Sequence, residues 1–480
     1  MKKAILALVI LCIVAITQVY SQKELIVETG DSFVFLDVKI DLDGNYVSNF
    51  FRDSLGFKYG AGLIKFNDSL EYQLYHHQKG NDYVTFETFV LTDENNYLIA
   101  GTIGTQHYYN HTIYILLLDK DFNTIAESFY ELPEQYSNPI VKMLKSPEGK
   151  IYVTLGRGSP SGMMKGVIEI SPQAEIINAK MYYGMGYSIL NPFPNPDGGL
   201  FLFRQFMGNA FAGITSVDTM LNFDTTYYFP ENMNGITCDM GTNGYCKWLN
   251  DSVYIICTEG LFETPTLDLY LYKVSKQHQL LTVPFFVGNP TEHDNCPPNQ
   301  SIDWVDPQNI YTVGYMSLSM ANRSTYFVSI INQDFELLGT KVCGGDYNTW
   351  IKSITATADG GCIMVGARRD YHAGIYRDTD GYIAIFQPDD IITSAAETAS
   401  PYDSDYLLFP NPGTNELNIQ TARKGVNLHI FDQAGRLVLH HKLSNEFRNQ
   451  ISTTQLKPGF YHIRMTDKEG NVENQKWVKQ

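Results

Sequence analysis

The segment Asp359-Gly360-Gly361-Cys362-Ile363-Met364-Val365-Gly366 places a tight polar turn directly before a short apolar strand, and this combination recurs along the chain. Each copy carries Asp-Gly, Asn-Asn or a similar pair at the turn. The second residue of the pair falls at positions 44, 96, 149, 198, 251, 308 and 360, so successive copies lie 52, 53, 49, 53, 57 and 52 residues apart. A period this regular is typical of a repeat architecture.

Each repeat also contains a second alternating strand that ends in a polar turn. Tyr114–Leu118 followed by Asp119–Asn123 is one example, and Tyr326–Ile331 and Tyr382–Phe386 are others. Period-two alternation bounded by Asp, Asn, Gly and Pro indicates strands and hairpins. The 32 Tyr and 27 Phe suit half-buried pleated surfaces. The sequence therefore predicts an all-β protein.

A unit of about 50 residues accommodates four antiparallel strands, and such units close most naturally into a β-propeller. Across residues 23–392 the repeats resemble those of kelch-type and related bacterial propellers. The resemblance implies a seven-bladed β-propeller. We expect a strand within Glu24–Phe35 to close the ring by pairing with the last repeat, because this removes an exposed sheet edge. An open solenoid or a pair of β-sandwiches is the alternative.

The chain changes character after the repeats. Residues 393–405 are rich in Ser, Ala, Thr and Asp without apolar periodicity, which indicates a linker. The motif Phe409-Pro410-Asn411-Pro412 follows, then short alternating strands, the turn Asp432–Gly435, the segment Leu456–Ile463 and the basic finish Lys476–Gln480. At least six short strands in this space predict a small immunoglobulin-like β-sandwich.

These motifs, in this order over residues 406–480, resemble the type A C-terminal sorting domain of the type IX secretion system. The resemblance implies recognition by the secretion machinery through the Lys457-Pro458-Gly459 hairpin and the C-terminal strand. Trp477 stands where members of that family often have a smaller apolar residue. The residues that match the sorting signal are Pro410, Asn411, Pro412, Gly435, Pro458, Gly459, Tyr461, Lys476 and Lys479.

The N-terminus predicts export. Lys2 and Lys3 precede an apolar run over Ala4–Ile16, and Val19-Tyr20-Ser21 fits a signal-peptidase site, so residues 1–21 are expected to be a signal peptide. The run is shorter than the roughly 20 residues of a membrane span, and none comparable follows, so no transmembrane segment is predicted. Together with the sorting domain, this predicts a secreted or outer-membrane surface protein that passes through the periplasm.

The charge of the chain limits the classes of partner, and its cysteines bear on disulfides and metal binding. The 52 acidic and 35 basic residues give a net charge of -17, which disfavours nucleic acid and anionic lipid as partners because both need a basic face. Without Cys12 of the signal peptide six cysteines remain, and an oxidising periplasm permits disulfides among them. Their pairing stays open, with Cys238 and Cys246 the most local pair. No zinc-type spacing occurs.

In a propeller the longer connections between second and third strands would share one face with the links between blades. Binding residues concentrate on variable loops held by a rigid scaffold, so this face is the expected ligand site. Its aromatic side chains would stack on sugar rings or peptide, and its arginines would pair carboxylates. The candidate residues are Tyr108, Tyr109, Phe206, Phe211, Phe262, Arg368, Arg369, Tyr371, Tyr376 and Arg377.

Other polar motifs offer weaker candidates. His76-His77 and His293-Asp294 lack partners at a diagnostic spacing for a metal or acid/base site. Asp41–Gly44 and Asp378–Gly381 look like calcium loops, but hairpin turns explain them better because the glycine comes too early. Nucleophile, zinc-protease, phosphate-loop and dinucleotide motifs are missing. The sequence predicts no catalytic residue, no metal and no cofactor.

Two functions follow from these observations. The first is a non-enzymatic secreted or surface protein whose loop face binds a glycan, peptide or protein. The second is a secreted polysaccharide hydrolase or lyase, since propeller enzymes assemble their acids from distant blades. Two or more buried carboxylates clustered with an arginine would favour the enzyme, and an aromatic face without carboxylates would favour binding.

Overall fold

The structure is a computed structural model of the 480-residue chain. It describes residues 23–28, 32–54, 58–80, 82–104, 112–133, 139–159, 162–183, 188–206, 212–229, 232–233, 236–237, 239–261, 268–282, 284–288, 293–316, 324–344, 347–369, 379–391, 406–409, 413–421, 423–433, 435–445, 448–468 and 472–479.

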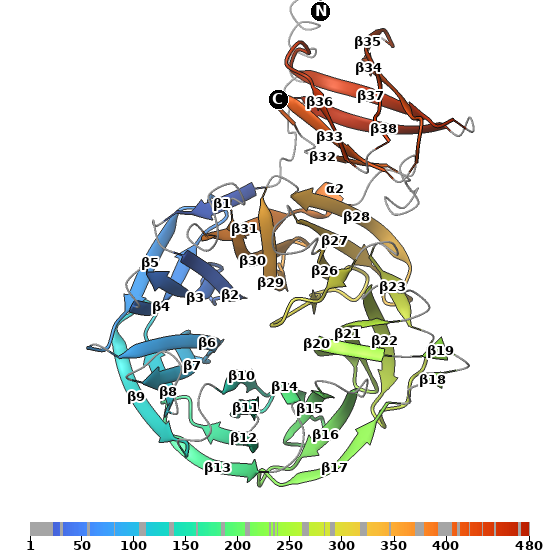
Figure 1. Ribbon diagram of the computed structural model, residues 1–480. Coiled ribbons are helices and arrows are strands. Elements are labelled where there is room, and N and C mark those ends of the chain that lie inside the picture. The colour runs from blue at the N-terminus through green and yellow to red at the C-terminus, as the bar shows by residue number, and fades with distance from the viewer. Residues whose placement is uncertain are drawn as a thin grey trace, which may run out of the picture.

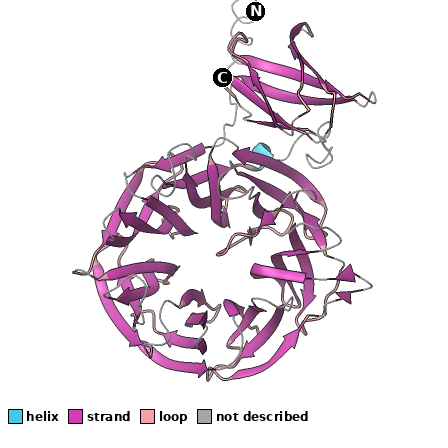
Figure 2. Cartoon of the chain, in the orientation of Figure 1, coloured by secondary structure: helices cyan, strands magenta, loops and turns pink. Residues whose placement is uncertain are grey.

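The described residues are almost entirely β-strands (Figure 2), and the predicted all-β class is confirmed. The helix α2 (Pro388–Ile391) follows the last repeat. The first two repeats form one sheet of β2 (Ser32–Ile40), β3 (Tyr46–Ser54), β4 (Lys58–Phe66) and β5 (Tyr72–His77), and a second of β6 (Tyr83–Leu91), β7 (Tyr97–Gly104), β8 (Thr112–Leu118) and β9 (Thr124–Glu131).

The pattern continues through the middle of the chain. The next sheets are β10 (Ile140–Lys145), β11 (Ile151–Ser159), β12 (Gly162–Ile170) and β13 (Ile176–Tyr183); β14 (Ser188–Pro194), β15 (Leu200–Phe206), β16 (Ala212–Val217) and β17 (Phe223–Tyr228); and β20 (Asp239–Asn250), β21 (Val253–Leu261), β22 (Asp268–Ser275) and β23 (Phe285–Val287). A small ribbon of β18 (Asn232–Met233) and β19 (Ile236–Thr237) precedes β20.

The last two repeats depart slightly from this pattern. In one sheet β26 (Ile310–Met316), β27 (Thr325–Ile331) and β28 (Leu337–Gly344) follow the short strands β24 (Asp294–Asn295) and β25 (Ile302–Asp303), which both pair with β26. The other consists of β29 (Asn348–Ala356), β30 (Cys362–Arg369), β31 (Thr379–Phe386) and the N-terminal β1 (Lys23–Val27). Each predicted turn-strand segment lies in the second sequential strand of its repeat, except Ile310–Gly314, which lies in β26 after the two short strands β24 and β25.

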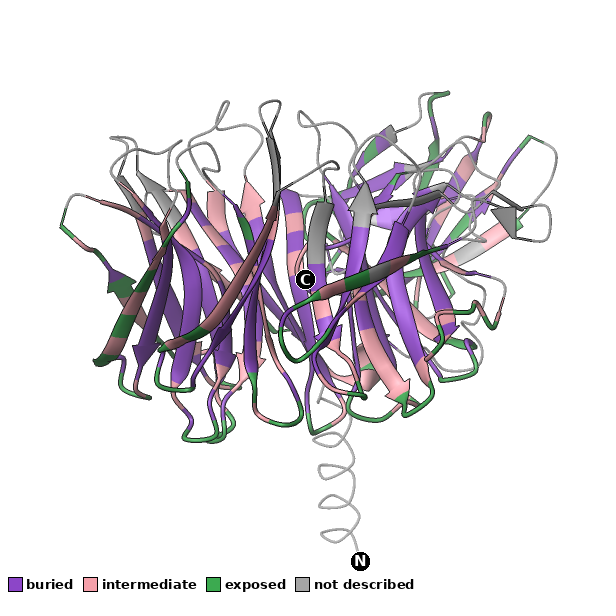
Figure 3. Cartoon of the chain, turned by 90° about the horizontal axis from the view of Figure 1, so that it is seen from below, coloured by how far each residue is buried: buried purple, intermediate pink, exposed green. Residues whose placement is uncertain are grey.

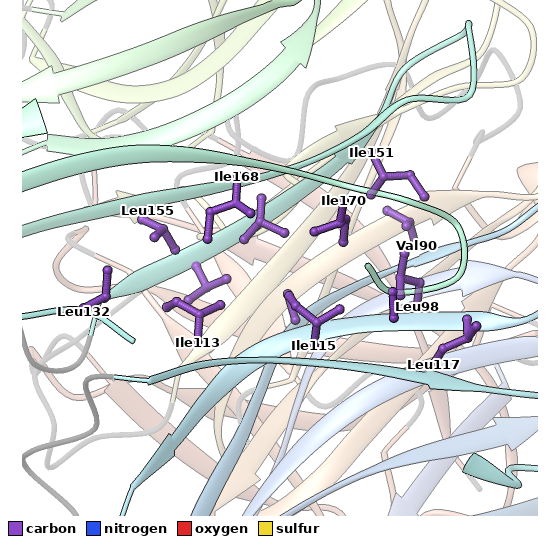
Figure 4. Close-up of a cluster of buried hydrophobic side chains, with 14 residues drawn as sticks. Val90, Leu98, Ile113, Ile115, Leu117, Leu132, Ile151, Leu155, Ile168 and Ile170 are labelled. Carbon is purple, nitrogen blue, oxygen red and sulfur yellow. The ribbon is translucent and has the colours of Figure 1, made fainter. Parts of the chain in front are cut away.

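The sheets stand around a central axis (Figure 1), and buried side chains join each sheet to the next. Figure 4 shows one such core, in which Leu98 and Ile115 of one sheet face Ile168 and Ile170 of the next. Middle strands such as β7 and β27 are buried on both faces because a neighbouring sheet covers each face. The outer strand β9 alternates between exposed and half-buried residues, since its outer face meets solvent.

The predicted pairing of an N-terminal strand with the last repeat is confirmed, but the closing strand is shorter than the predicted stretch. β1 pairs antiparallel with β31, from Lys23 opposite Ile385 to Val27 opposite Gly381. The rest of the predicted closing stretch, from Ser32 onward, belongs to β2 instead. Val27 and Phe33 share a core with Ile363 and Ile383, so the first and last sheets pack together.

One five-residue turn closes the hairpins at one end of the sheets. Its fourth residue donates a backbone hydrogen bond to the first, and the first donates one to the fifth. Asp41 opens such a turn, and its Oδ1 accepts the amides of Asp43 (3.0 Å) and Asn45 (2.8 Å). The prediction that Asp41–Gly44 forms a hairpin turn is therefore confirmed. In side view these turns are exposed along one face (Figure 3).

The fourth residue of the turn has a positive φ and differs between the two hairpins of a repeat. Between first and second strands it is usually Gly or Asn, as at Gly44 (φ 83°) and Asn95 (φ 63°). Between third and fourth strands it is often apolar, as at Phe122 (φ 67°) and Leu221 (φ 62°), and both side chains are buried. Burial of these side chains offsets a backbone conformation that non-glycine residues adopt at a cost.

The described residues from 406 onward form two sheets around a core of their own. One sheet contains β32 (Leu407–Phe409), β33 (Glu416–Gln420) and β36 (Arg448–Ser452). The other contains β35 (Leu437–Lys442), β34 (Asn427–Asp432), β37 (Gly459–Thr466) and β38 (Val472–Lys479). Trp477 is fully buried between the sheets, with its ring centroid 5.9 Å from that of Tyr461. The large side chain at this position therefore fills the core.

We predict that Phe122→Gly destabilises the ring. The Phe122 ring stacks on Tyr75 with a centroid distance of 5.4 Å, and truncating a buried phenylalanine costs about 3–5 kcal/mol. Relief of the positive φ returns only about 1 kcal/mol, so the free energy of unfolding should fall by about 3 kcal/mol in chemical denaturation. The control Gly44→Ala, which meets open space, should cost about 1 kcal/mol. Stabilisation by Phe122→Gly would contradict this explanation of the turn.

Candidate functional site

The strand ends opposite the tight turns define the loop face. They include the end of β7 at Gly104, of β15 at Phe206 and of β30 at Arg369. Phe206 and both arginines thus lie at the predicted face. The other predicted ligand residues lie outside the described residues: Tyr108, Tyr109, Phe211, Phe262, Tyr371, Tyr376 and Arg377.

The connection between β11 and β12 is a hairpin, not a long loop. β11 continues to Ser159 and β12 begins at Gly162, with Arg157 opposite Met164. The backbone ladder between these strands therefore extends well into Arg157–Lys165. The loop face is correspondingly uneven around the ring.

The two described arginines of the predicted set occupy aromatic platforms. The Arg368 guanidinium carbon lies 4.0 Å from the centroid of the Tyr347 ring, and that of Arg369 lies 5.5 Å from the centroid of Trp350. Both side chains are half-buried. Arg368 Nε is buried and has no hydrogen-bond partner within the described part of the chain. Stacking fixes the plane of a guanidinium while its edge donors can still pair a carboxylate.

Arg368 also has an acidic neighbour in the sheet. In the register of β30 and β31, Asp380 lies directly opposite Arg368. Side chains opposite each other on antiparallel strands lie close together and face the same side. A ligand carboxylate at Arg368 would therefore meet the negative charge of Asp380, which should weaken its binding.

Three buried carboxylates, which the search for motifs did not single out as a group, lie near the same face. Glu259 lies near the loop-side end of β21 and its Oε2 accepts the amide of Cys296 at 3.1 Å, while Oε1 lies 3.5 Å from Asn243 Nδ2. Asp268 begins β22, and its Oδ2 accepts the hydroxyl of Tyr270 at 3.4 Å. Asp294, at the start of β24, is fully buried, and its carboxylate lies close to Gly288.

The carboxylates do not point the same way. Glu259 pairs with Leu269 and Gly260 pairs with Asp268, so Glu259 and Asp268 project from opposite faces of their sheet. Glu259 faces Cys296 and the next sheet, whereas Asp268 lies on the side of Tyr270, which packs with the preceding sheet. The sheet itself separates the two acids. Apolar strands flank both residues, so no sequence pattern marks them beyond the presence of an acid at the end of such a strand.

A second polar region lies along the central axis. Residues 296–301 between β24 and β25, here called the axial segment, extend into the ring (Figure 1). The Asn299 amide donates to the carbonyl of Lys352 (3.2 Å), and the side chain of Asn299 donates to the carbonyl of Leu36. The backbone of Gln300 forms an isolated parallel β-bridge with Ser353, and the side-chain oxygen of Gln300 accepts a hydrogen bond from Lys39 Nζ at 3.4 Å. The segment accounts for the longest repeat spacing, from 251 to 308.

Lysines hold the axial segment. Lys142 Nζ donates to the carbonyl of Pro298 at 2.9 Å and to Asn299 Oδ1. Burial lowers the pKa of Lys142 to about 8, although the nearby carboxylates of Asp37 and Glu87 oppose the shift. Burial likewise raises the pKa of Glu87 and lowers that of Lys352. This polar interior contacts the innermost strands of several sheets and serves to hold them together.

His77, one of the two histidines named as a weak candidate, makes hydrogen bonds that hold the fold together. The Tyr114 hydroxyl donates to Glu127 Oε1 and lies 3.0 Å from His77 Nε2, and the Tyr75 hydroxyl lies 3.0 Å from His77 Nδ1. Because Tyr114 donates to Glu127, it accepts from Nε2–H of His77. Burial lowers the pKa of His77, which favours this neutral ring. His77 therefore joins two neighbouring sheets.

Metal-binding clusters and membrane-spanning helices would each bear on the function of the chain. Within the described ranges no three His, Cys, Asp or Glu side chains are arranged to hold a metal ion. The helical part of those ranges contains nothing long and apolar enough to cross a membrane. Of the six cysteines that follow the expected signal peptide, Cys238 lies outside the described residues, and the other five are present as thiols.

The sorting-signal residues lie in the C-terminal pair of sheets, except that Pro410, Asn411 and Pro412 are outside the described residues. The Tyr461 hydroxyl donates to the carbonyl of Lys457 at 2.6 Å, which braces the turn at Pro458 and Gly459. Gly435 occupies the positive-φ position of the Asp432–Arg436 turn. Lys476 is exposed, whereas Lys479 is buried and its Nζ donates to the carbonyl of Thr414.

Residues 407–480 match the family described as "Secretion system C-terminal sorting domain". This match confirms the type IX sorting domain and indicates export to the cell surface or the extracellular space. No curated protein matches the chain.

Several solved structures are similar to the chain at low identity. A fungal alcohol oxidase of the AA5 family shares 10% identity with a TM-score of 0.47, covering 96% of this chain and 99% of that one. The polysaccharide lyase Uly1 shares 9% with a TM-score of 0.45, covering 74% and 90%. A protein of unknown function from Bacteroides caccae shares 8% with a TM-score of 0.39, covering 65% and 94%. Similarity at this level carries no argument about activity.

We predict that Lys142 gives the protein a stability that rises with alkaline pH. Between its folded pKa of about 8 and the unfolded value near ~10.4, the unfolded chain binds more protons, so the free energy of unfolding increases with pH. One proton contributes at most about 1.4 kcal/mol per pH unit. Chemical denaturation at several pH values between 8 and 10 measures the slope. In Lys142→Met the slope should be smaller, whatever the variant's absolute stability; an unchanged slope would rule out a buried, destabilised charge at Lys142.

Proposed function

We propose that the chain is an exported binding protein whose loop face captures an anionic extracellular glycan. In this proposal residues 1–21 are a signal peptide, residues 23–392 are a seven-bladed, kelch-like β-propeller, residues 393–405 are a linker and residues 406–480 are an immunoglobulin-like sorting domain. Pro410, Asn411, Pro412, Gly435, Pro458, Gly459, Tyr461, Lys476 and Lys479 would form the sorting signal.

The stacked Arg368 carries the ligand part of the proposal. Its guanidinium is held over Tyr347, and its Nε–H has no acceptor within the described residues. A planar, fixed guanidinium suits a carboxylate better than a neutral sugar hydroxyl. The predicted contacts Tyr108, Tyr109, Phe206, Phe211, Phe262, Arg369, Tyr371, Tyr376 and Arg377 would complete this face.

The overall charge of -17 does not exclude an anionic ligand. At physiological ionic strength, exposed charges separated by more than about 8 Å are largely screened. Binding would therefore depend on the local pairing at Arg368, modulated by the adjacent Asp380. A uronic-acid polysaccharide presents repeated carboxylates on sugar rings and matches both the arginines and the aromatic side chains. An acidic peptide is the other ligand that the test can reveal.

The arrangement of the buried acids supports binding over catalysis. A glycoside hydrolase needs two carboxyl groups on either side of one bond, a few ångströms apart. Glu259 and Asp268 instead leave their sheet on opposite faces and accept hydrogen bonds from Cys296 and Tyr270. A polysaccharide hydrolase or lyase stays the second candidate because three acids, including Asp294, are buried near the loop face.

The proposal predicts opposite effects of two neighbouring substitutions on glycan affinity. In isothermal titration of the full mature chain with polygalacturonate, Arg368→Ala should weaken binding about tenfold, since a hydrogen bond to a charged group contributes about 1.5–3 kcal/mol. Asp380→Asn should strengthen it by removing a competing charge. Arg436→Ala is the control, because Arg436 is exposed in the sorting domain and pairs with Asp432.

The ligand has its own control. Fully methyl-esterified polygalacturonate keeps the sugar rings and removes the charge, so its binding should be weak. Equal affinity for both polymers, or an Arg368→Ala variant that binds like the parent, would contradict an arginine-carboxylate site. Release of reducing or unsaturated sugar ends in the same mixture would establish the enzyme instead.

A further inference from the structure

Two buried cysteines meet in the core that joins two neighbouring sheets. Cys257 lies in the middle of β21, and Cys296 is the first residue of the axial segment. Both are fully buried and belong to one apolar cluster with Leu271 and Ile302. Residues 39 positions apart in the sequence (296 minus 257) thus bring two thiols into the same packed space.

The contacts place the Cys296 thiol against the backbone of Cys257, within the core that both residues share. Cys296 Sγ lies 3.8 Å from the carbonyl oxygen of Cys257, and Cys257 Sγ lies 3.5 Å from Thr312 Oγ1. Cys296 is held in place from the other side, because its amide donates to Glu259 Oε2. Side chains in contact across a rigid interface need little backbone movement to form a disulfide.

The route of export supplies the oxidising conditions. The sorting domain indicates export to the cell surface or beyond, by way of the periplasm, where disulfides form and persist. Neither thiol is accessible in the folded ring, so the bond must form while the sheets are still assembling. Cys246 and Cys362 lie in the cores of other sheet pairs.

We infer that Cys257 and Cys296 are joined by a disulfide in the exported protein. The two thiols lose two protons and two electrons to an incoming disulfide of a periplasmic thiol oxidant, which is reduced to a dithiol, and one S–S bond forms between Sγ of Cys257 and Sγ of Cys296. The bond anchors the start of the axial segment to β21. It therefore fixes the segment that fills the centre of the ring to the neighbouring sheet.

The direct test is chemical mapping of the full-length protein collected after secretion. The sample is denatured without reductant, its free thiols are alkylated with iodoacetamide, and its peptides are analysed by mass spectrometry. We expect a cross-linked peptide pair that contains Cys257 and Cys296, which separates after reduction. Alkylation of both residues in the unreduced sample would overturn the inference. This readout needs no variant and so does not depend on the folding of one.

A stability measurement gives an independent test. A disulfide that closes a loop of this length should raise the melting temperature by about 5 °C, so a strong thiol reductant should lower the Tm of the parent by that amount. The double variant Cys257→Ser, Cys296→Ser should show no response to the reductant. The control Cys362→Ser, also fully buried, should respond like the parent. An equal response in the double variant and the parent would overturn the inference.

Discussion

The pairing of β1 with β31 is the constraint on which the rest of the ring depends. The five residues Lys23–Val27 complete a sheet whose other strands come from the far end of the repeats. Side chains strengthen this strand pairing. The Tyr382 hydroxyl donates to Glu24 Oε1 at 2.8 Å, and Val27 packs in the core shared with β2. With this edge covered, each sheet packs between two neighbours. That packing explains why the middle strands are apolar on both faces.

Packing on both sides also explains the composition of the turns. A turn between third and fourth strands places its positive-φ residue against the neighbouring sheet, where Phe122 and Leu221 are buried. In a turn between first and second strands, the positive-φ position is usually occupied by Gly or Asn. The repeat is therefore visible in the sequence mainly through one of its two hairpins. The other hairpin uses the same hydrogen bonds with an apolar residue, which turn statistics disfavour.

Sequence periodicity was sufficient to predict the strands, the hairpins and the closing N-terminal strand, because these follow from local alternation and turn chemistry. It could not predict the axial segment, since the Pro298–Gln300 stretch has no periodic pattern and its partners Leu36, Lys142 and Lys352 are remote in the chain. It also could not tell in which direction the acids point. The opposed orientations of Glu259 and Asp268 depend on the register of β21 with β22.

On the loop face, two arginines at the end of β30 stack on aromatic rings. Arg368 and Arg369 follow each other on β30 and so lie on opposite faces of their sheet, one over Tyr347 and the other over Trp350. Arg368 was predicted because it begins a long connection on the loop face, and its stacking partner Tyr347 directly precedes β29 of the same sheet. The antiparallel pairing of β29 with β30 brings these two residues together. The arginine platform of the binding proposal therefore depends on the pairing of these two neighbouring strands.

Hydrogen exchange in a mature chain that lacks residues 22–27 tests ring closure most directly. If β1 completes the ring, amides of β29–β31 should lose most of their protection in this variant, because the open sheet separates from β2. Amides of β11 and β12, on the opposite side of the ring, should change less, and β33–β38 should not change because they have a separate core. Unchanged protection in β29–β31 would contradict closure by β1.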